Sequence, residues 1–502
     1  MPDTIEHLIG ETLVFGIPGP RPTKEDLRLF RDTRAAGLIL YRINFRSPAQ
    51  VKQLIREMEE SLERRLLITV DHEGGRVVMF ESGVTVFPDN LAFGAAGRTE
   101  HTRAQGAMEG RELRRLGVDV SFSPTVDVLT EAFSPNIGIR SYGQDPSLVG
   151  RLASARIRAL QREGVSACAK HFPGLGPATL DPHLDLPVID VGWRELRTRH
   201  LNPFASAIKT GVDMIMSSHP LYPKLDPHPG TPATFSRRLM TELLREELGF
   251  QGVAASDDLE MGALRGLADV GRAAVLAARA GHDLILCCHR RDLQRRVFEA
   301  LREAYRSGEL RVKDLERSVG RIRSLRGRRA ERFAPGPARA EPAGAVLAKT
   351  IAQNAVRVKT GKASLPLMEK VHLIFPRLSD LAQKIMIEPD LRHERAFLKN
   401  RLPGNVSAKI SLISLDPGRR EIQEVRSVHR PSDVTVFFCY DAHLQPGNRK
   451  LLEALQKDKC PLVVVLMRDP YDLEFIAPTT TVVSASGYRQ AQLEACLKKI
   501  FQ

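Results

Sequence analysis

The sequence predicts a (β/α)8 barrel followed by a smaller α/β domain with a mostly parallel sheet. Three observations lead to this fold class. The chain has 502 residues, which is too long for one ordinary domain. Eight short apolar runs alternate with helical segments in its first part, and strand-like runs return after a change of composition beyond Leu325. A doubly wound open sheet is the structural alternative for the first part.

The first domain, expected over residues 1–325, contains the eight predicted strands. Between them lie segments with amphipathic spacing and good helix formers, such as 49–64, 99–116 and 146–163. Eight strand–helix units in this length of chain are typical of a (β/α)8 barrel. The predicted strands are 13–15, 38–41, 66–70, 118–122, 166–169, 214–216, 253–255 and 283–286.

A linker is expected over residues 326–344, which read RGRRAERFAPGPARAEPAG and are rich in Pro, Gly, Ala and Arg. The second domain is expected over residues 345–502, with a helical segment at 448–456. Neither domain contains a P-loop or a GxGxxG motif. The predicted strands of the second domain are 371–375, 411–415, 434–440, 462–467 and 481–484.

The composition is that of a soluble globular protein, with 42% hydrophobic and 27% charged residues. The net charge of +14 could favour nucleic acid or an acidic small substrate. However, the basic residues are interleaved with acidic ones along helical segments. One Trp and seven Tyr also argue against long aromatic platforms that grip a polymer. We expect a small-molecule substrate, no nucleic acid and no obligate protein partner.

The N-terminal sequence MPDTIEHLIGETLVFGIPG has no basic segment followed by an apolar run, so no signal peptide is expected. No stretch approaches the ~20 apolar residues of a transmembrane helix. The six cysteines form no CxxC pair, and most lie in or beside apolar runs, which favours buried thiols over disulfides. These features predict a cytoplasmic protein that does not bind a membrane.

Polar residues follow several of the predicted barrel strands. In a barrel, such residues gather at the carboxyl ends of the strands, where catalytic groups lie. Each one alone could be a turn or capping residue, but the set is hard to explain by packing. It comprises Asp71 after the third strand, Lys170 and His171 after the fifth, Ser217, Ser218 and His219 after the sixth, and Asp257 after the seventh.

The segment 170–183, KHFPGLGPATLDPH, carries an Asp–His couple in a stretch too rich in Pro and Gly for a helix or a central strand. Asp181 and His183 lie two residues apart. A nearby carboxylate raises the basicity of a histidine and fixes its tautomer, so this couple is a candidate acid/base device. Asp185 is an alternative partner for His183.

The chemistry of these groups suits cleavage of a glycosidic bond. Asp257 can attack a sugar anomeric carbon, with His183 as the acid/base, but its neighbour Asp258 competes for the nucleophile role and composition alone does not choose. Sugar hydroxyls can be bound through charge-assisted hydrogen bonds. The candidates for that binding are Asp71, Arg140, Lys170 and His171.

A metal site is the competing interpretation of the histidines. The possible ligands would be His171, Asp181, His183 and His219. No HExxH or HxH pair occurs, and Lys170 would repel a cation. We therefore expect no metal and no other cofactor.

Six ordered motifs resemble glycoside hydrolase family 3, in its bacterial β-N-acetylglucosaminidase branch of two-domain type. The resemblance covers roughly residues 5–325. The motifs are DHEGGRV (71–77), IGIRSYG (137–143), KHFPGLG (170–176), DPHLDLP (181–187), SSHPLYPKLD (217–226) with PATFS (232–236), and SDDLEMGA (256–263).

The resemblance implies a role for each matching residue. Asp257 matches the family's nucleophile, His183 the unusual histidine acid/base of the branch, and Asp181 its dyad partner. The fold implied is a (β/α)8 barrel, to which some members append an α/β sandwich, and residues 345–502 resemble that appendix, best at RDPYDL (468–473). The residues that match those holding the non-reducing N-acetylglucosamine are Asp71, Arg140, Lys170 and His171.

Three positions depart from the family pattern. Met79 stands where an Arg commonly adds a sugar contact. Pro182 replaces the usual Ser between Asp181 and His183, and it restricts Asp181 to extended conformations. Leu175 replaces a common His, which we expect to change packing only.

The resemblance implies a cofactor-free, retaining exo-β-N-acetylglucosaminidase. Its implied substrates are GlcNAc-containing muropeptides from cell-wall recycling or chito-oligosaccharides. A phosphorylase of the same family is the first alternative, because a histidine acid/base leaves room for phosphate. A non-catalytic sugar-binding or scaffold protein is the second. A β-glucosidase is the third, although such members usually take their acid/base from the second domain, where no matching Glu motif occurs.

Overall fold

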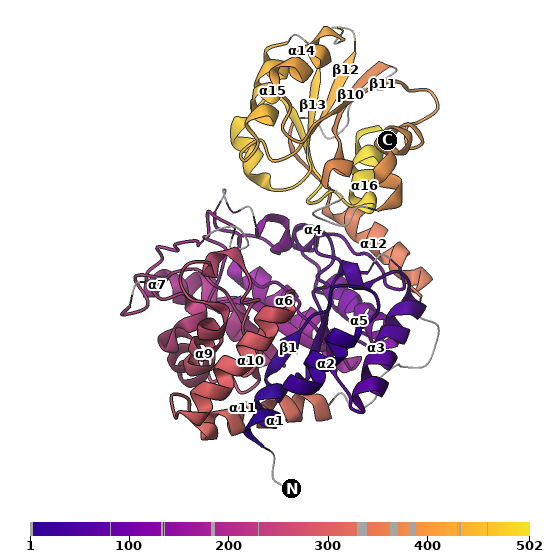
Figure 1. Cartoon of the computed structure of the whole chain (residues 1–502). Helices are drawn as coiled ribbons and strands as arrows, with labels where there is room; N and C mark the ends of the chain where they lie inside the picture. Colours follow the sequence, from indigo (N-terminus) through magenta and orange to yellow (C-terminus); the bar gives the residue numbers. More distant parts are fainter. Residues whose placement is uncertain are drawn as a thin grey trace.

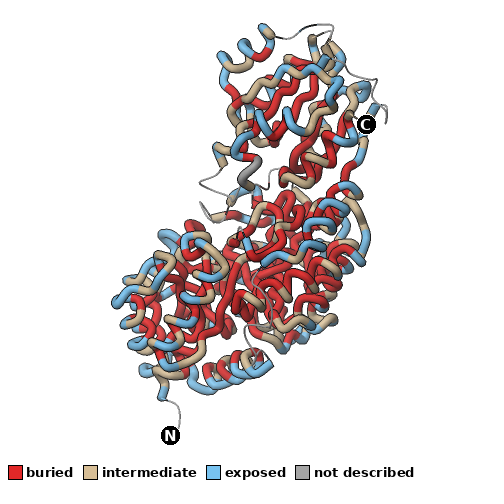
Figure 2. Tube along the Cα trace, turned by 90° about the vertical axis from the view of Figure 1, so that its right-hand side faces the viewer, coloured by how far each residue is buried: buried red, intermediate tan, exposed pale blue. Residues whose placement is uncertain are grey.

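The computed structural model describes residues 4–80, 82–131, 134, 136–181, 186–228, 230–328, 339–361, 370–381, 388–428, 430, 433–458 and 460–501. These residues form two domains, and the second lies over one end of the first, next to α4 (Asn90–Ala96) and α12 (Pro342–Ala355) (Figure 1). Buried segments fill the centre of each domain (Figure 2). In this described part of the chain, no helix combines the length and the apolar character needed to span a membrane.

Eight parallel strands form the sheet of the first domain, in the order β7-β6-β5-β4-β3-β2-β1-β8. A parallel bridge between Ala255 and Leu284 joins the two ends of this order. The sheet therefore closes into a barrel, which confirms the predicted fold class and excludes the open sheet. The strands are β1 (Leu13–Phe15), β2 (Gly37–Leu40), β3 (Leu67–Val70), β4 (Val120–Ser121), β5 (Ser166–Phe172), β6 (Met214–Ser217), β7 (Val253–Ala255) and β8 (Ile285–Cys287).

Helices surround this barrel, and local signals fix where several of them begin (Figure 1). Before α3, the Ser47 hydroxyl accepts a hydrogen bond from the Gln50 N–H at 3.2 Å, and Pro48 occupies the first helical position. The barrel helices are α1 (Ile5–Glu11), α2 (Lys24–Thr33), α3 (Pro48–Leu62), α4, α5 (Thr99–Leu116), α6 (Pro146–Arg162), α7 (Trp193–Glu195), α8 (Leu201–Thr210), α9 (Val270–Ala280), α10 (Arg291–Arg306) and α11 (Val312–Gly327).

The barrel interior is a packed apolar core. Inward-facing side chains such as Phe122 and Met216 form one cluster, which also includes Ile322 and Leu325 from α11. Burying such a side chain stabilises the fold by roughly 1.5–3 kcal/mol. Because α11 closes the end where the strands begin, the carboxyl ends of the strands remain the open face of the barrel.

The second domain contains a six-stranded sheet in the order β11-β10-β12-β13-β14-β9. All neighbouring strands are parallel except β9, which pairs antiparallel with β14, so the predicted mostly parallel sheet is confirmed. The elements are β9 (Arg357–Thr360), β10 (Lys370–Pro376), α13 (Glu394–Lys399), β11 (Ser407–Ile413), α14 (Arg419–Ser427), β12 (Val434–Cys439), α15 (Pro446–Lys457), β13 (Leu462–Leu466), β14 (Thr481–Ser484) and α16 (Gln490–Phe501).

The structure differs from the expectations at two places. Lys170 and His171 lie inside β5, which continues to Phe172, and do not follow it. The linker expected over 326–344 is helical at both ends, because α11 reaches Gly327 and α12 begins at Pro342. Residues 329–338 lie outside the described part of the chain. All six cysteines are free thiols, as expected.

Charged residues gather at the carboxyl edge of the second sheet, at the ends of β12 and β13. Asp441, Arg468 and Asp469 are each at most 5% exposed. Arg468 donates a hydrogen bond to Asp441. Nearby, His443 Nδ1 lies 2.6 Å from Asp472 Oδ1. Burial raises the pKa of Asp469 to about 7, while Arg468 acts in the opposite direction.

The raised pKa of Asp469 predicts that stability falls as the pH rises. The folded protein keeps a proton that the unfolded chain loses at its lower, ordinary pKa, so this stabilisation is complete at acid pH and disappears as the pH passes through about 7. We expect a melting temperature a few degrees lower at about pH 8.5 than at about pH 5.5. Asp469→Asn should reduce this difference, because an amide cannot ionise.

A surface carboxyl provides the control for this prediction. Asp458 pairs with Arg426 at the exposed side of the second domain. Asp458→Asn should leave the pH dependence of melting as in the native protein. An Asp469→Asn variant with the full native pH dependence would show that Asp469 keeps its charge in the folded state.

Candidate active site

A cavity of about 670 Å³ lies at the carboxyl ends of the barrel strands. This volume is within the usual range for small-molecule sites. Most of the residues that line the cavity have polar or charged side chains, and they come from the ends of β2, β3, β5, β7 and β8 and from the loops after these strands and after β4. The lining residues are Tyr41, Arg42, Asp71, Glu73, Arg76, Val77, Val78, Met79, Asn136, Arg140, Lys170, His171, Asp181, Asp257, Asp258, Glu260, Met261 and His289.

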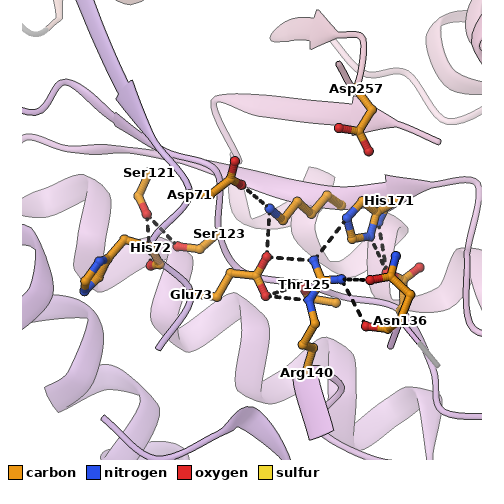
Figure 3. Close-up of polar contacts among 12 residues, drawn as sticks. Asp71, His72, Glu73, Ser121, Ser123, Thr125, Asn136, Arg140, His171 and Asp257 are labelled. Atoms are coloured by element: carbon orange, nitrogen blue, oxygen red, sulfur yellow. Dashed lines mark hydrogen bonds and ion pairs between the residues drawn. The ribbon is translucent and has the colours of Figure 1, made fainter. Parts of the chain in front are cut away.

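Glu73 forms the centre of a buried charge network at the base of this cavity (Figure 3). Its carboxylate accepts two hydrogen bonds from Arg140, at 2.9 Å from Nε and 2.8 Å from Nη2. Lys170 Nζ lies 2.8 Å from the same carboxylate, and Thr125 donates to it at 3.1 Å. The bidentate pair fixes the plane of both groups, so this network is rigid before any ligand binds.

Lys170 joins the network to Asp71. Its Nζ lies 2.5 Å from Asp71 Oδ1, and its side chain is 3% exposed. Burial alone would lower the pKa of Lys170, but Asp71 and Glu73 outweigh it and raise this pKa well above its usual value. Burial alone would raise the pKa of Glu73, but Arg140 and Lys170 hold it well below its usual range. These groups stay charged, which suits strong hydrogen bonds to sugar hydroxyls.

His171 is oriented from behind by Asp127. Its Nδ1 lies 2.7 Å from Asp127 Oδ2, and the same carboxylate accepts hydrogen bonds from the backbone N–H groups of His171 and Leu175. A carboxylate can only accept, so Nδ1 carries a proton. Nε2, which lies 3.3 Å from Arg140 Nη2, can then accept a hydrogen bond. The imidazole is held in one tautomer at the cavity wall.

Asp257 and Asp258 differ in what their carboxylates do. Asp258 accepts hydrogen bonds from the Glu260 and Cys288 backbone N–H groups, both at 3.2 Å, and lies 3.2 Å from His289 Nε2. Asp257 accepts one from the Asp258 N–H at 2.9 Å, and its carboxylate points toward the side of the cavity that holds Asp71 and His171 (Figure 3). Of the two, Asp257 is the better placed to meet a ligand in the cavity.

The loop with the expected acid/base couple is described only in part. Asp181 lines the cavity. His183, Pro182 and the alternative partner Asp185 lie outside the described residues. Of the positions that depart from the family pattern, Met79 also lines the cavity, and Leu175 is buried with 1% exposure.

Three residues expected at the rim do not line the cavity. Ser218 donates to the Phe172 carbonyl at 3.0 Å, and Ser217 lies 2.9 Å from His282 Nε2. His219 bridges Thr234 and the Asp258 carbonyl. All three are at most 1% exposed. They support the strand ends from inside the domain, so the expectation that they join the site is corrected.

The prediction from sequence missed Glu73, Asn136, Tyr41 and His289. Glu73 stands inside the DHEGGRV motif, where a carboxylate among glycines was a visible signal. Its pairing with Arg140 joins residues 67 positions apart and has no local signature. Asn136 accepts from Arg140 Nη1 at 2.8 Å, and Tyr41 contacts the His289 ring at a centroid distance of 5.0 Å.

Potential metal ligands converge in the second domain. Within the described residues, the group of His, Cys, Asp and Glu side chains close enough to share an ion is Asp441, His443 and Asp469. Arg468 donates a hydrogen bond to Asp441, so a guanidinium already provides positive charge to this group. At the cavity, Lys170 and Arg140 already pair with the Glu73 carboxylate. A site with two bound cationic side chains is better suited to neutral polar ligands than to a metal ion.

Comparison with known proteins adds three findings. Residues 4–325 match the Glycosyl hydrolase family 3 N terminal domain. The chain is 36% identical over 286 residues to the beta-hexosaminidase of Methylobacillus flagellatus, covering 56% of this chain and 81% of that protein. It is 37% identical over 295 residues to the beta-hexosaminidase of Idiomarina loihiensis, and this match covers 57% of this chain and 87% of that protein.

A solved structure resembles both domains. The glycoside hydrolase family 3 beta-N-acetylglucosaminidase of Paenibacillus sp. str. FPU-7 superposes with a TM-score of 0.91 at 30% identity. The match covers 99% of this chain and 97% of that one. The relatives from Methylobacillus and Idiomarina match over little more than half of the chain, whereas this one extends through the second domain.

Proposed function

Since this chain belongs to glycosyl hydrolase family 3, we propose that it is a retaining exo-β-N-acetylglucosaminidase. It is a glycoside hydrolase, and its relatives from Methylobacillus, Idiomarina and Paenibacillus carry hexosaminidase or N-acetylglucosaminidase names. The observation that carries the proposal is that Asp257 and Asp181 line one cavity together with the charged Lys170–Glu73–Arg140 network.

The proposed reaction proceeds in two steps. In the first, Asp257 attacks the anomeric carbon and forms a glycosyl-enzyme, while His183 protonates the leaving oxygen. In the second, His183 acts as a base on water, which cleaves the glycosyl-enzyme with overall retention. Asp181 orients His183 and stabilises its protonated form.

The charge network is proposed to bind the terminal sugar. Lys170 and Arg140 donate to hydroxyl oxygens, Asp71 accepts from hydroxyl groups, and His171 contributes its Nε2. Lys170 and Arg140 are 3% and 8% exposed, so the network forms the closed end of the cavity. A closed end that binds one sugar through its hydroxyls supports exo cleavage from the non-reducing end.

The proposed natural substrates are muropeptides that carry a terminal GlcNAc, or chito-oligosaccharides. Arg42 and Arg76 line the cavity and offer guanidinium groups to the carboxylates of a muropeptide. The net charge of +14 also favours an anionic substrate. The proposal places this activity in the cytoplasm.

Product analysis distinguishes hydrolysis from phosphorolysis. With GlcNAc–MurNAc fragments as substrate, we expect free GlcNAc as the product and a release rate that does not change when phosphate is added. GlcNAc-1-phosphate, formed at a rate that rises with phosphate, would establish the phosphorylase alternative instead. A chain that binds GlcNAc but releases neither product would be the sugar-binding protein.

A further inference from the structure

We propose that the second domain positions the sugar-binding network, by holding the two barrel loops that carry Glu73 and Arg140. Among the residues that the structure describes, none from the second domain lines the cavity. Its effect would therefore pass through the loops. The interpretation of these loops as sugar-binding rests on the proposed function, whereas the contacts that hold them do not.

The loop before Arg140 is embedded in the second domain. The Ile139 side chain is fully buried and belongs to the hydrophobic core of the second domain, together with Met467 and Tyr488. Gly138, at φ +42°, lies so close that a Cβ there would fall 2.7 Å from Asp469 Oδ2. The two residues before Arg140 are thus enclosed by side chains from the ends of β13 and β14.

Arg489 of the second domain forms hydrogen bonds with the loop after Glu73. Arg489 is 2% exposed and donates two hydrogen bonds to the Gly75 carbonyl, with Nε at 2.7 Å and Nη2 closer still. Gly75 lies two residues after Glu73 and has φ +51°. This contact joins residues 414 positions apart, and it holds a loop glycine in the left-handed backbone conformation that glycine readily adopts.

A second contact of this loop passes through Asp89. This carboxylate accepts a hydrogen bond from the Arg76 N–H at 2.7 Å. From the other domain Gly487 packs against it, where a Cβ would fall 2.3 Å from Asp89 Oδ2. Arg76 itself lines the cavity, so the interface continues to the cavity wall. Figure 1 shows the second domain over α4, which begins directly after Asp89.

Both contacts converge on one ion pair. The Glu73–Arg140 pair bridges the two loops. Glu73 lies two residues before Gly75, and Arg140 directly follows Gly138 and Ile139, which contact the second domain. The barrel holds the same loops from behind, through Arg156 to the Glu73 carbonyl and Asn90 to the Arg140 carbonyl, both at 2.7 Å. The loops are thus anchored on both sides, and Lys170 lies between Glu73 and Asp71.

The test uses Arg489→Met and Arg489→Lys in the full chain. Met keeps most of the volume without a donor, and Lys keeps the charge with one contact. The matched control is Arg426→Met, which removes a surface pair with Asp458. Arg426 belongs to α14, at the far end of the second domain from the barrel (Figure 1). The measurements are kcat and KM for 4-nitrophenyl β-N-acetylglucosaminide, and hydrogen exchange of the 71–79 and 136–141 backbone.

In Arg489→Met we expect kcat/KM to fall by about tenfold or more, mainly through KM, because small displacements of binding groups weaken substrate positioning strongly. Exchange should rise in both loops. Arg489→Lys should recover part of kcat/KM, and Arg426→Met should behave as the native protein. A purely stabilising role would lower the melting temperature while folded molecules kept native kinetics and native loop exchange, and that result would overturn the proposal.

The two measurements separate this proposal from the proposed function. If the native protein cleaves no β-N-acetylglucosaminide, the proposed function fails, and the exchange comparison still decides whether the second domain holds the loops. If the native protein is active and Arg489→Met matches it in kcat/KM and in loop exchange, the positioning role is wrong. If Arg489→Met does not fold, Arg489→Lys decides by the same criteria.

Discussion

Replacing Asp257 with Ala is expected to reduce kcat by about 10⁴-fold or more, because it removes the carboxylate that we propose as the nucleophile. Its carboxylate lies at the cavity, and we propose that it forms the covalent bond to the sugar. The change removes a partly exposed side chain, so the melting temperature should stay near that of the native protein. Turnover of 4-nitrophenyl β-N-acetylglucosaminide by the purified variant measures the loss.

Asp258→Ala is the matched control, because it removes the neighbouring carboxylate. Asp258 accepts hydrogen bonds from two backbone N–H groups and lies beside His289. We expect this variant to melt at a lower temperature and to keep more activity per folded molecule than Asp257→Ala. If Asp258→Ala instead lost more activity per folded molecule than Asp257→Ala, the nucleophile role would be assigned to Asp258. Native-like turnover by both variants would remove the carboxylate mechanism altogether.

The second large effect is expected for His183→Ala, and its size should depend on the leaving group. A natural disaccharide needs a proton on its leaving oxygen, so we expect a loss of about 10²–10⁴-fold in kcat/KM with such a substrate. A 4-nitrophenyl leaving group needs little proton donation, so with that substrate the rate of the bond-breaking step should fall far less. Asp181→Asn should show the same trend more weakly, because the role that we propose for Asp181 is to orient this histidine.

Equal losses for both substrates in His183→Ala would contradict the acid role of this histidine. Small nucleophiles such as azide offer a further check, since they do not need a general base in the second step. Azide should restore turnover of the 4-nitrophenyl substrate by His183→Ala. The product should be the β-glycosyl azide, formed from the glycosyl-enzyme. In Asp257→Ala no glycosyl-enzyme forms, so any azide product should be the α-glycosyl azide, because a single direct displacement inverts the anomeric carbon.

The barrel was predictable because its strands are buried on both faces. Each predicted strand of the first domain overlaps an observed one, since a strand covered on both sides is a short continuous apolar run. The second sheet was harder at its edges. The strand β9 was missed, and β11 begins at Ser407 rather than at 411. Both are edge strands with partly exposed side chains, so their sequences carry little apolar signal.

The candidate site was predictable where polar residues follow a buried run. By this rule Asp71, Lys170, His171 and Asp257 were expected together, and the structure places all four around one cavity. The same rule misplaced His219 and the two serines before it. A polar side chain at a strand end can also point into the protein and form hydrogen bonds there, as His219 does. The sequence does not show which way such a side chain points.

Contacts between distant segments could not be read from the chain at all. The pairing of Glu73 with Arg140 depends on how the barrel brings two of its loops together, and the hydrogen bonds from Arg489 to Gly75 depend on how the two domains meet. A buried carboxylate needs a cation, but the sequence offers 74 Lys and Arg residues as partners. Only the fold selects among them.

Trapping the glycosyl-enzyme tests the central claim most directly. A fluorinated N-acetylglucosaminyl fluoride should react with the native protein and leave a sugar whose release is slow. We predict that mass spectrometry of a digest locates this sugar on Asp257, within the segment SDDLEMGA (256–263). A label on any other residue, or steady turnover of the reagent without a labelled peptide, would contradict a retaining mechanism with Asp257 as the nucleophile.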